Sequence, residues 1–355
     1  MNRESRSIEE VRLLEFVSKA QGETKLEKYS KSDLLSSALI VVEGFEERSI
    51  GVLKSLALRQ AKVSTLVIGR YNANTSLNAR FRESLEEFAG QVALNGYKVV
   101  EVDDSLWVPR ALAMCEEDRV IVDVSAVSHK EMFPLLDGLV AERRTTYLAY
   151  SEAESYWPTR AEWERLRGSL SGGERIAELV DEKPWLFGCE HTVGYVPNHE
   201  GYGGTARGVA LLAFLPYKCA RLAAILGEES YSELLFIGGQ PRLRKNRWRF
   251  RALMEINEPL IGARSVTAMP TFGYKDCVTG LTNLLFRTDR PVQEYDVHLA
   301  LLGSKLQTVG CWIVATYLPS IVALTSTPRE YFPEAFSDGV GESWFFRLVD
   351  PNRYL

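Results

Sequence analysis

The feature that most limits how this 355-residue chain folds is an ordered series of segments that occurs twice. The apolar run at 38–42 resembles the run at 210–214. The run at 66–69 resembles the run at 235–238, and both of these runs end in glycine. The triplet Arg-Phe-Arg then follows each glycine at equal spacing. A repeat on this scale constrains the architecture before any motif is considered.

The two series continue in the same order to their ends. Short strand-like segments with one aspartate at 120–124 and 295–297 precede helical faces, and apolar strands follow at 146–150 and 321–324. Strands that alternate with helices, without hairpin dipeptides, are typical of parallel βαβ units. The sequence therefore predicts an α/β fold class: two tandem Rossmann-like three-layer domains related by internal duplication. We expect an N-terminal helix within 1–30, the first repeat at 31–160, a linker at 161–207 and the second repeat at 208–355.

Composition and cysteine usage favour a cytoplasmic protein. The five cysteines are widely spaced, odd in number and include no CxxC, which argues against a disulfide framework. The N-terminus is charged and runs into a capping-box pattern at Ser7, so we expect no signal peptide. The uncharged stretch 306–328 has helical spacing and then a strand pattern, which predicts a core helix and strand with no contact to a membrane.

In open parallel sheets, ligands bind beyond the carboxyl ends of the strands, where the strand order reverses. After the first strand of each half stand segments that contain Arg48 and Arg221, and neither segment is a GxGxxG fingerprint. A GxxxxGK[ST] loop is also absent from the sequence. We therefore expect neither a dinucleotide cofactor nor P-loop chemistry, and we expect Arg48 to line the crevice.

The most basic segment of the chain follows the second strand of the second half. Arg242 and Lys245 begin this run, which extends to Arg251 and includes Trp248. Arginines of this kind bind phosphate oxygens, and an aromatic ring stacks on a base. The alternative is an ordinary solvated helix start that balances acidic neighbours.

A hydroxyl and a lysine follow the fourth strand in both halves. The first half has Ser125, Ser128 and Lys130, and the second has Ser304 and Lys305. A helix N-terminus with hydroxyl donors and a cation is suited to binding an anion. Serines before helices are also the usual N-caps, and that structural interpretation stays open.

These residues resemble a known family. Asp123-Val124-Ser125 through Lys130-Glu131-Met132 looks like the strand-four turn of CARF domains, which are Rossmann-like sensors of cyclic oligonucleotides. The segments 297–302 and 306–310 are similar to the matching part of SAVED domains, in which two CARF-like halves are fused. The resemblance implies a nucleotide ligand, a role in bacterial antiviral defence or signalling, and a separate effector protein as partner. Ala126 and Val127 depart from the family, because they replace glycines that let backbone approach a phosphate.

Enzymatic alternatives rest on carboxylates near the predicted crevice. Glu152 in the first half and Glu342 in the second are suited to general acid or base work in N-glycosidic or phosphodiester cleavage, and Glu152 is equally suited to bind a ligand. No catalytic residue can be assigned from the sequence. Cys189, Glu190, His191 and His199 match no standard zinc spacing, so we expect no metal.

The leading hypothesis is therefore a sensor of a nucleotide-type ligand that regulates a separate effector. A nucleoside- or nucleotide-acting enzyme and a protein that binds single-stranded nucleic acid through Arg242–Arg251 are the alternatives. The formal charge of −5, from 42 basic and 47 acidic residues, argues against coating nucleic acid through net charge. The residues expected at the ligand site are Arg48, Ser125, Ser128, Lys130, Glu152, Arg242, Lys245, Ser304 and Lys305.

Overall fold

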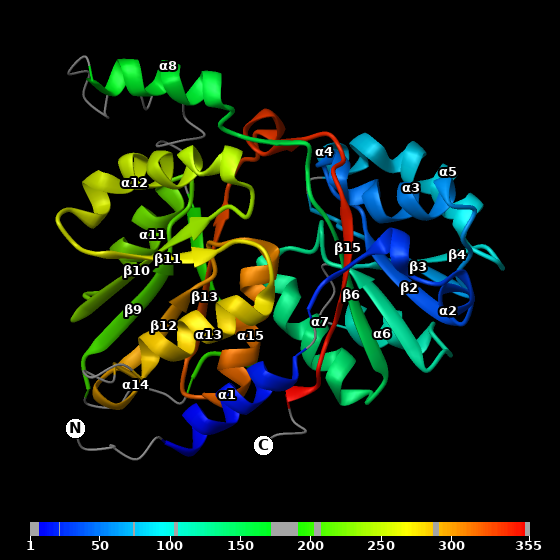
Figure 1. Ribbon diagram of the computed structural model, residues 1–355, viewed down its shortest axis with the longest axis horizontal. Helices are drawn as coiled ribbons and strands as arrows, with labels where there is room; N and C mark the ends of the chain where they lie inside the picture. Colours follow the sequence, from blue (N-terminus) through cyan, green and yellow to red (C-terminus); the bar gives the residue numbers. More distant parts are fainter. Residues whose placement is uncertain are drawn as a thin grey trace. The chain divides into compact units, whose positions relative to one another are not determined.

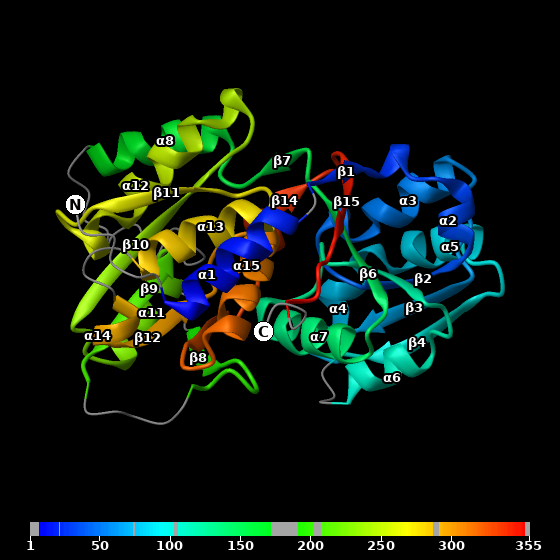
Figure 2. The same ribbon diagram turned by 60° about the horizontal axis from the view of Figure 1, so that its bottom comes forward.

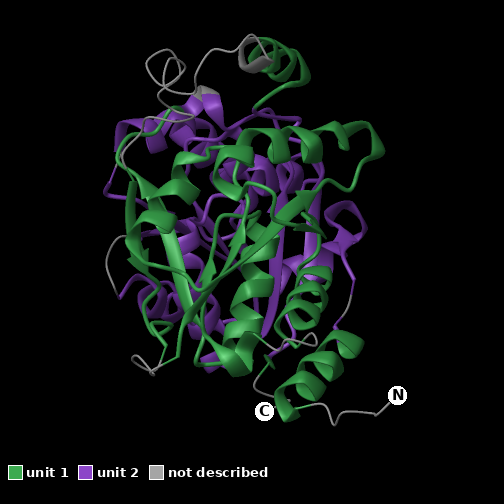
Figure 3. Cartoon of the chain, turned by 90° about the vertical axis from the view of Figure 1, so that its left-hand side faces the viewer, with its two compact units in different colours: residues 1–19, 158–332, 351–355 green, residues 20–157, 333–350 purple. Residues whose placement is uncertain are grey.

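A computed structural model describes the protein at residues 7–20, 22–73, 75–102, 106–171, 191–201, 207–286 and 291–351. The chain divides into two compact units, coloured separately in Figure 3. Unit 1 comprises Met1–Lys19, Pro158–Phe332 and Pro351–Leu355. Unit 2 comprises Ala20–Trp157 and Pro333–Asp350.

Unit 2 is built on a seven-stranded sheet in the order β1-β15-β6-β5-β2-β3-β4 (Figure 1). The strands from β4 to β6 are parallel, while β15 and β1 run antiparallel to their neighbours. Because β2 lies between β3 and β5, the strand order reverses at β2 and β5. The strands are β1 (Thr24–Lys25), β2 (Ser37–Val42), β3 (Thr65–Arg70), β4 (Tyr97–Glu101), β5 (Arg119–Asp123), β6 (Thr145–Ser151) and β15 (Ser343–Arg347).

Helices cover the unit 2 sheet in two groups. The helices α3 and α5 pack against each other, as do α6 and α7. Leu53 and Leu56 of α3 join Leu39 and Val41 of β2 in one buried cluster, as expected where an apolar helix stripe meets a buried parallel sheet. The elements are α2 (Lys31–Leu35), α3 (Gly51–Leu58), α4 (Thr75–Asn78), α5 (Arg82–Val92), α6 (Trp107–Ala113), α7 (His129–Ala141), the single turns η1 (Leu26–Lys28), η2 (Glu47–Ile50), η3 (Ala79–Phe81) and η5 (Pro333–Ala335), and a small ribbon of β7 (Ser155–Tyr156) and β14 (Ser337–Asp338).

Unit 1 is built on a six-stranded sheet in the order β11-β10-β9-β12-β13-β8. The five strands from β11 to β13 are parallel, and β8 is antiparallel to β13. The order therefore reverses at β9 and β12, as it does at β2 and β5 of unit 2. The strands are β8 (His191–Tyr195), β9 (Val209–Phe214), β10 (Glu233–Gln240), β11 (Val266–Pro270), β12 (Asp296–Ala300) and β13 (Val322–Pro328).

The helices of unit 1 also lie against its sheet and against one another. In this unit α1 lies alongside α13 and α15 (Figure 2), and α11 packs on β13 and β8. Every described residue of α15 after Lys305 is buried except Thr316, which explains the uncharged stretch read from the sequence. The elements are α1 (Ile8–Lys19), α8 (Arg160–Ser171), α11 (Ala220–Glu228), α12 (Trp248–Ile261), α13 (Tyr274–Leu285), α14 (Pro291–Glu294), α15 (Lys305–Tyr317) and the single turn η4 (Arg244–Asn246).

The antiparallel strand of each sheet comes from an unexpected part of the chain. β8 follows β6 and α8 in sequence, but it pairs with β13 in unit 1. β15 follows β13 in sequence, but it pairs with β6 in unit 2. The predicted 161–207 linker thus holds α8 and β8, and the predicted second repeat at 208–355 holds a strand of the unit 2 sheet.

The predicted fold class is confirmed as two Rossmann-like α/β units. Each has five parallel strands in the same order, with the first strand in the middle. The predicted helix and strand within 306–328 are α15 and β13. The origin of the two units by duplication stays a prediction. In the part of the chain that the structure describes, no helix is long and apolar enough to span a membrane.

Candidate functional site

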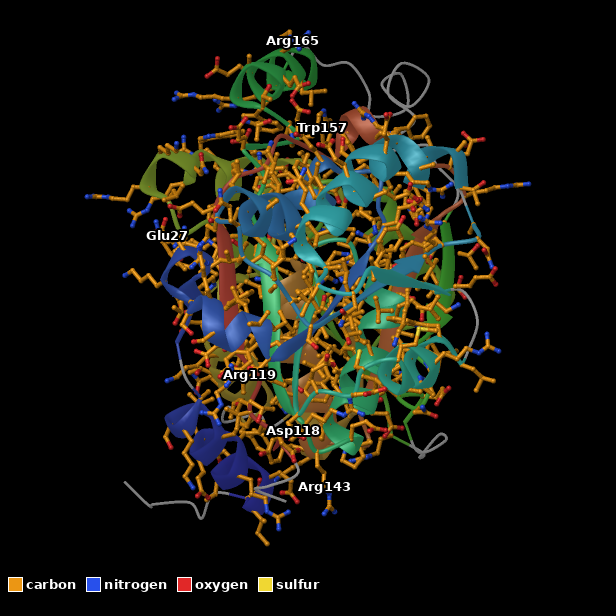
Figure 4. All side chains as sticks on the ribbon, turned by 90° about the vertical axis from the view of Figure 1, so that its right-hand side faces the viewer. Glu27, Asp118, Arg119, Arg143, Trp157 and Arg165 are labelled. Atoms are coloured by element: carbon orange, nitrogen blue, oxygen red, sulfur yellow. The ribbon has the colours of Figure 1, made fainter. Side chains whose placement is uncertain are left out.

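The candidate sites lie at the carboxyl ends of the parallel strands. Figure 4 shows the two edges of unit 2. Asp118, Arg119 and Arg143 lie toward the amino-terminal edge of its parallel strands, and Trp157 lies toward the carboxyl edge. At the carboxyl edge, the loop with Gly44 follows β2 and the loop with Ala126 follows β5. A Cβ atom at residue 44 would lie 2.8 Å from the Ala126 Cβ, so glycine is required where these two loops touch.

A buried carboxylate stands at the end of β2. Glu43 is 1% exposed and accepts two hydrogen bonds from the Arg82 guanidinium, at 3.0 and 2.7 Å. The Arg70 Nε lies 3.2 Å from Oε2 of the same carboxylate. Hydrogen bonding to Glu43 raises the pKa of Arg82. Two arginines near the unit 2 crevice are therefore held by a residue of the protein itself.

Ser125, predicted at the ligand site, is fully buried beside the end of β5. Its hydroxyl donates to Asp123 Oδ1 at 2.5 Å and accepts from the Ser151 backbone N–H at 2.8 Å. The Ser151 hydroxyl in turn lies 2.7 Å from the Ser343 hydroxyl of β15. This chain of hydrogen bonds ties β5, β6 and β15 together, which is a structural role.

Within this cluster, the carboxyl group of Asp123 has a raised pKa. It is 2% exposed, and its Oδ2 atom has no hydrogen-bond partner among the described residues. Burial raises the pKa of Asp123 to about 7, because the charged form is poorly solvated there; hydrogen bonds from Ser125 and the charge of Arg48 oppose the shift. The carboxyl group is thus able to change protonation state near neutral pH.

Arg48 is also buried, and its charge is matched within unit 2. Its guanidinium donates to Glu46 at 3.0 and 3.1 Å and to the Tyr150 hydroxyl at 3.3 Å. Burial alone would lower the pKa of Arg48, but Glu46 together with Tyr150 and Tyr156 outweighs it, so the pKa is raised. Ser337, from the far end of the sequence, donates to the same carboxylate. Arg48 is therefore part of an internal polar cluster.

The helix that follows β5 begins as the structural interpretation expects. Ser128 is the N-cap of α7 and accepts from the Glu131 N–H at 3.2 Å. The Ser128 N–H donates to the Tyr71 hydroxyl at 2.8 Å. Lys130 is exposed in the first turn. Lys130 is thus the predicted cation of unit 2 that projects most freely into solvent.

The corresponding helix of unit 1 has a complete capping box. Ser304 accepts from the Gln307 N–H at 3.2 Å, and Gln307 Oε1 accepts from the Ser304 N–H at 2.8 Å. The Ser304 hydroxyl also donates to the Thr271 carbonyl at 2.6 Å. Lys305, at the first position of α15, is partly buried. Both predicted serines are N-caps, and both lysines stand in first turns.

The basic run lies near the same loop of unit 1. The Arg242 guanidinium lies 4.3 Å from the centre of the Phe272 ring, one residue after Thr271. Lys245 is exposed in η4. Arg249 differs, because it is buried and donates to the Pro158 carbonyl at 2.7 Å. In unit 1 the structure therefore brings Ser304 and Arg242 to adjacent residues of the β11–α13 loop.

The two candidate acid–base residues both have partners. Trp344 Nε1 donates to Glu152 at 3.2 Å, and Glu342 pairs with Lys25. The backbone N–H of Glu152 donates to the Glu342 carbonyl at 2.9 Å, which brings the two residues together. Cys189 and Glu190 lie outside the described residues, and no group of three potential metal ligands occurs in the described part of the chain.

Sequence reasoning missed two residues of unit 1. Arg221, in the first turn of α11, donates from Nε to the Ser326 carbonyl at 3.2 Å. Ser326 is 2% exposed, and its hydroxyl oxygen is buried without a hydrogen-bond partner among the described residues. The available signal was the absence of any acidic residue from 215–221, the segment that joins β9 to α11.

The chain matches no protein-family model, and no curated protein matches its sequence. Its structure is similar to that of a Type III CRISPR defence DNA nuclease activated by cyclic oligoadenylate, with 11% identity and a TM-score of 0.48. The match covers 78% of this chain and 64% of the nuclease, so the chain spans less than two thirds of that protein. The chain is also similar to a universal stress protein from Archaeoglobus fulgidus DSM 4304, with 10% identity, a TM-score of 0.24 and coverage of 83% and 97%. At 10 to 11% identity, both likenesses concern the fold alone.

Proposed function

We propose that the protein senses a nucleotide-type ligand at the carboxyl ends of its strands and regulates a separate effector protein. The observation that carries the proposal is that both fourth strands lead into a helix with a serine N-cap and a first-turn lysine, beside the reversal of strand order. Such a position combines backbone N–H groups, the helix dipole and a cation, which together favour a phosphate.

The residues around these positions support recognition of a small ligand. In unit 2 the buried groups Glu43, Asp123 and Arg48 are held in fixed positions by internal hydrogen bonds, and Lys130 is an exposed cation in the first turn of α7, the helix that follows β5. Fixed groups around one exposed charge lose little conformational entropy on binding. The resemblance of 123–132 to CARF domains supports a cyclic oligonucleotide as the ligand and a role in bacterial antiviral defence or signalling.

The test is a thermal-shift series with mononucleotides, dinucleotides and cyclic oligonucleotides, after native mass spectrometry of the purified protein to find any retained ligand. A ligand at about a hundred times its dissociation constant adds roughly 2.7 kcal/mol to the free energy of unfolding. The double variant Lys130→Ala with Lys305→Ala is expected to lose this stabilisation and to keep its unliganded Tm.

The matched control is Lys19→Ala with Lys62→Ala. Lys19 pairs with Glu15 on α1, and Lys62 precedes β3 at the amino edge of its sheet. This control should respond to ligand as the wild type does. Full stabilisation of the Lys130 and Lys305 variant would overturn the assignment of the site, and turnover of the nucleotide panel would favour an enzyme with Glu152 or Glu342 as acid or base.

Binding of single-stranded nucleic acid remains the second candidate, because of one observation. Segment 234–254 contains six basic residues and no acidic one, and Arg242, Arg244, Lys245 and Arg247 are exposed. Binding through these residues would release counterions and weaken steeply with salt. Retention on a single-stranded DNA column at low salt, lost in the variant Arg244→Ala with Lys245→Ala, would support it.

A further inference from the structure

Arg221 is a partly buried cation, and no carboxylate of the described residues pairs with it. Burial lowers the pKa of Arg221, and the nearby Tyr331 hydroxyl opposes this shift only in part. Within the described residues its hydrogen bond goes to a neutral carbonyl, that of Ser326, and no carboxylate forms an ion pair with it. Desolvating an arginine without a counterion is unfavourable for folding.

The position of Arg221 adds a second unfavourable contribution. It lies in the first turn of the nine-residue helix α11, where the helix dipole repels a positive charge. The N-cap residue, Cys219, makes no side-chain hydrogen bond to the helix. An anion at this point would offset both the desolvation of the guanidinium and its repulsion by the helix.

Ser326 provides an independent observation at the same place. It lies near the carboxyl end of β13 and is 2% exposed, yet its hydroxyl has no partner among the described residues. Buried hydroxyl groups are nearly always hydrogen-bonded, so an orphan one indicates a missing partner. Its own carbonyl accepts from Arg221, which places the orphan hydroxyl in the residue that the guanidinium contacts.

We propose that Arg221 and Ser326 of unit 1 form a binding site for one phosphate group of the ligand. The remaining N–H groups of the guanidinium form a planar donor pair that matches phosphate oxygens, and the Ser326 hydroxyl supplies a further donor. This inference deepens the proposed function, on which it rests, by assigning one further phosphate to the β9–α11 segment of unit 1, in addition to the serine-capped helix α15.

Inorganic phosphate is the first probe. Thermal shift and 31P NMR line broadening would be measured over a phosphate series, with ionic strength held constant by chloride. The variant Arg221→Gln should bind phosphate about ten- to a hundredfold more weakly, because it loses charge-assisted hydrogen bonds. Ser326→Ala should bind several-fold more weakly. The control Arg207→Gln, which breaks an ion pair with Asp296 at the amino edge of the same sheet, should bind as the wild type does.

The free protein offers a readout that a purely structural arginine would not give. Without phosphate, Arg221→Gln should raise the Tm by about 2 to 4 °C, because the variant no longer desolvates an unpaired cation. If Arg221 only supported the fold, the same change would lower the Tm. Arg221→Lys keeps the charge but not the planar donor pair, so it should fold and bind phosphate about tenfold more weakly, even if Arg221→Gln does not fold.

Failure of this inference is distinguishable from failure of the proposed function. Nucleotides that stabilise wild type and Arg221→Gln equally would overturn the phosphate site while the sensor function stands. Phosphate binding that depends on Arg221, with no response to any nucleotide, would overturn the sensor function while the site stands. Phosphate responses that are equal in wild type and Arg221→Gln indicate an adventitious ion only and overturn the site.

Discussion

Arg48 in unit 2 and Arg221 in unit 1 stand in comparable segments but have different environments. Arg48 lies in the turn η2 between β2 and α3, and Arg221 lies in the first turn of α11, the helix that follows β9. Glu46 neutralises Arg48 and raises its pKa, whereas burial without a carboxylate lowers the pKa of Arg221. Of two arginines in units with the same strand order, one thus has a carboxylate partner, and the other has none among the described residues.

The same difference extends to the neighbouring arginines. In unit 2, Arg70 and Arg82 both contact Glu43. In unit 1, the segments 215–221 and 234–254 contain no acidic residue at all. The lesson is that the strand order determines where arginines gather, while nearby acidic residues determine whether these arginines support the fold or remain available to an anion.

The largest effect on stability is expected at Glu43, the buried carboxylate that two arginines of unit 2 contact. Glu43→Gln should lower the free energy of unfolding by about 2 to 3 kcal/mol, because it removes the buried charge that Arg82 and Arg70 share, and Arg70 alone keeps a second carboxylate, that of Glu86. Urea denaturation at pH 7 measures the change. The control Glu47→Gln alters a pair with Lys54 at 3.9 Å near the surface and should cost less than about 0.5 kcal/mol. Equal losses in the two variants would contradict internal neutralisation at Glu43.

The next effect concerns the buried carboxyl of unit 2. The pKa of Asp123 is raised from 3.8 to about 7 in the folded protein, so the folded state binds the proton more tightly than the unfolded state does. Between about pH 4 and pH 7 the folded state therefore carries more protons, and this group makes stability fall as the pH rises through that window.

Asp123→Asn should remove this dependence. At pH 8 the variant should be about 2 kcal/mol more stable than the wild type, since the amide needs no charge and Oδ1 still accepts from Ser125. At pH 4 the two proteins should be close in stability, because the wild-type carboxyl is then protonated in the folded state. Denaturation curves from pH 4 to pH 8 test this, and an unchanged slope in the variant would refute a raised pKa.

The third prediction concerns a variant in which Arg48, like Arg221, has no carboxylate partner. Glu46→Gln removes the counterion of Arg48 and should strengthen phosphate binding by unit 2 about tenfold, or by about 1.4 kcal/mol. To detect it, the response would be measured in an Arg221→Gln background. The triple variant that adds Arg48→Gln should lose the gain. A gain that persists without Arg48 would show that the new binding lies elsewhere.

The sequence predicts the strands well because buried parallel strands are continuous apolar runs, as at 38–42 and 210–214. It also predicts the N-caps at Ser128 and Ser304, since capping depends on residues three positions apart. It does not predict that β8 joins the sheet of unit 1 and β15 the sheet of unit 2, because these antiparallel pairings join segments that are far apart in the sequence.

The candidate site shows the same division between local and long-range information. The cluster around Arg48 depends on Ser337, which is 291 positions from Glu46 in the sequence. Ser125 was expected to face a ligand, yet it is engaged by Asp123 and Ser151. Arg221 stands out only when its burial and the missing carboxylate are seen together, and neither property is local.

The smallest effects are expected at the two serine caps. Ser304→Ala should cost about 1 kcal/mol and Ser128→Ala about half as much. The difference arises because the Ser304 hydroxyl accepts from Gln307 and also donates to Thr271, while the Ser128 hydroxyl accepts from the Glu131 N–H. Denaturation without ligand measures these costs. If the caps are structural and the lysines carry the ligand response, both alanine variants should keep the thermal shift that Lys130→Ala with Lys305→Ala loses.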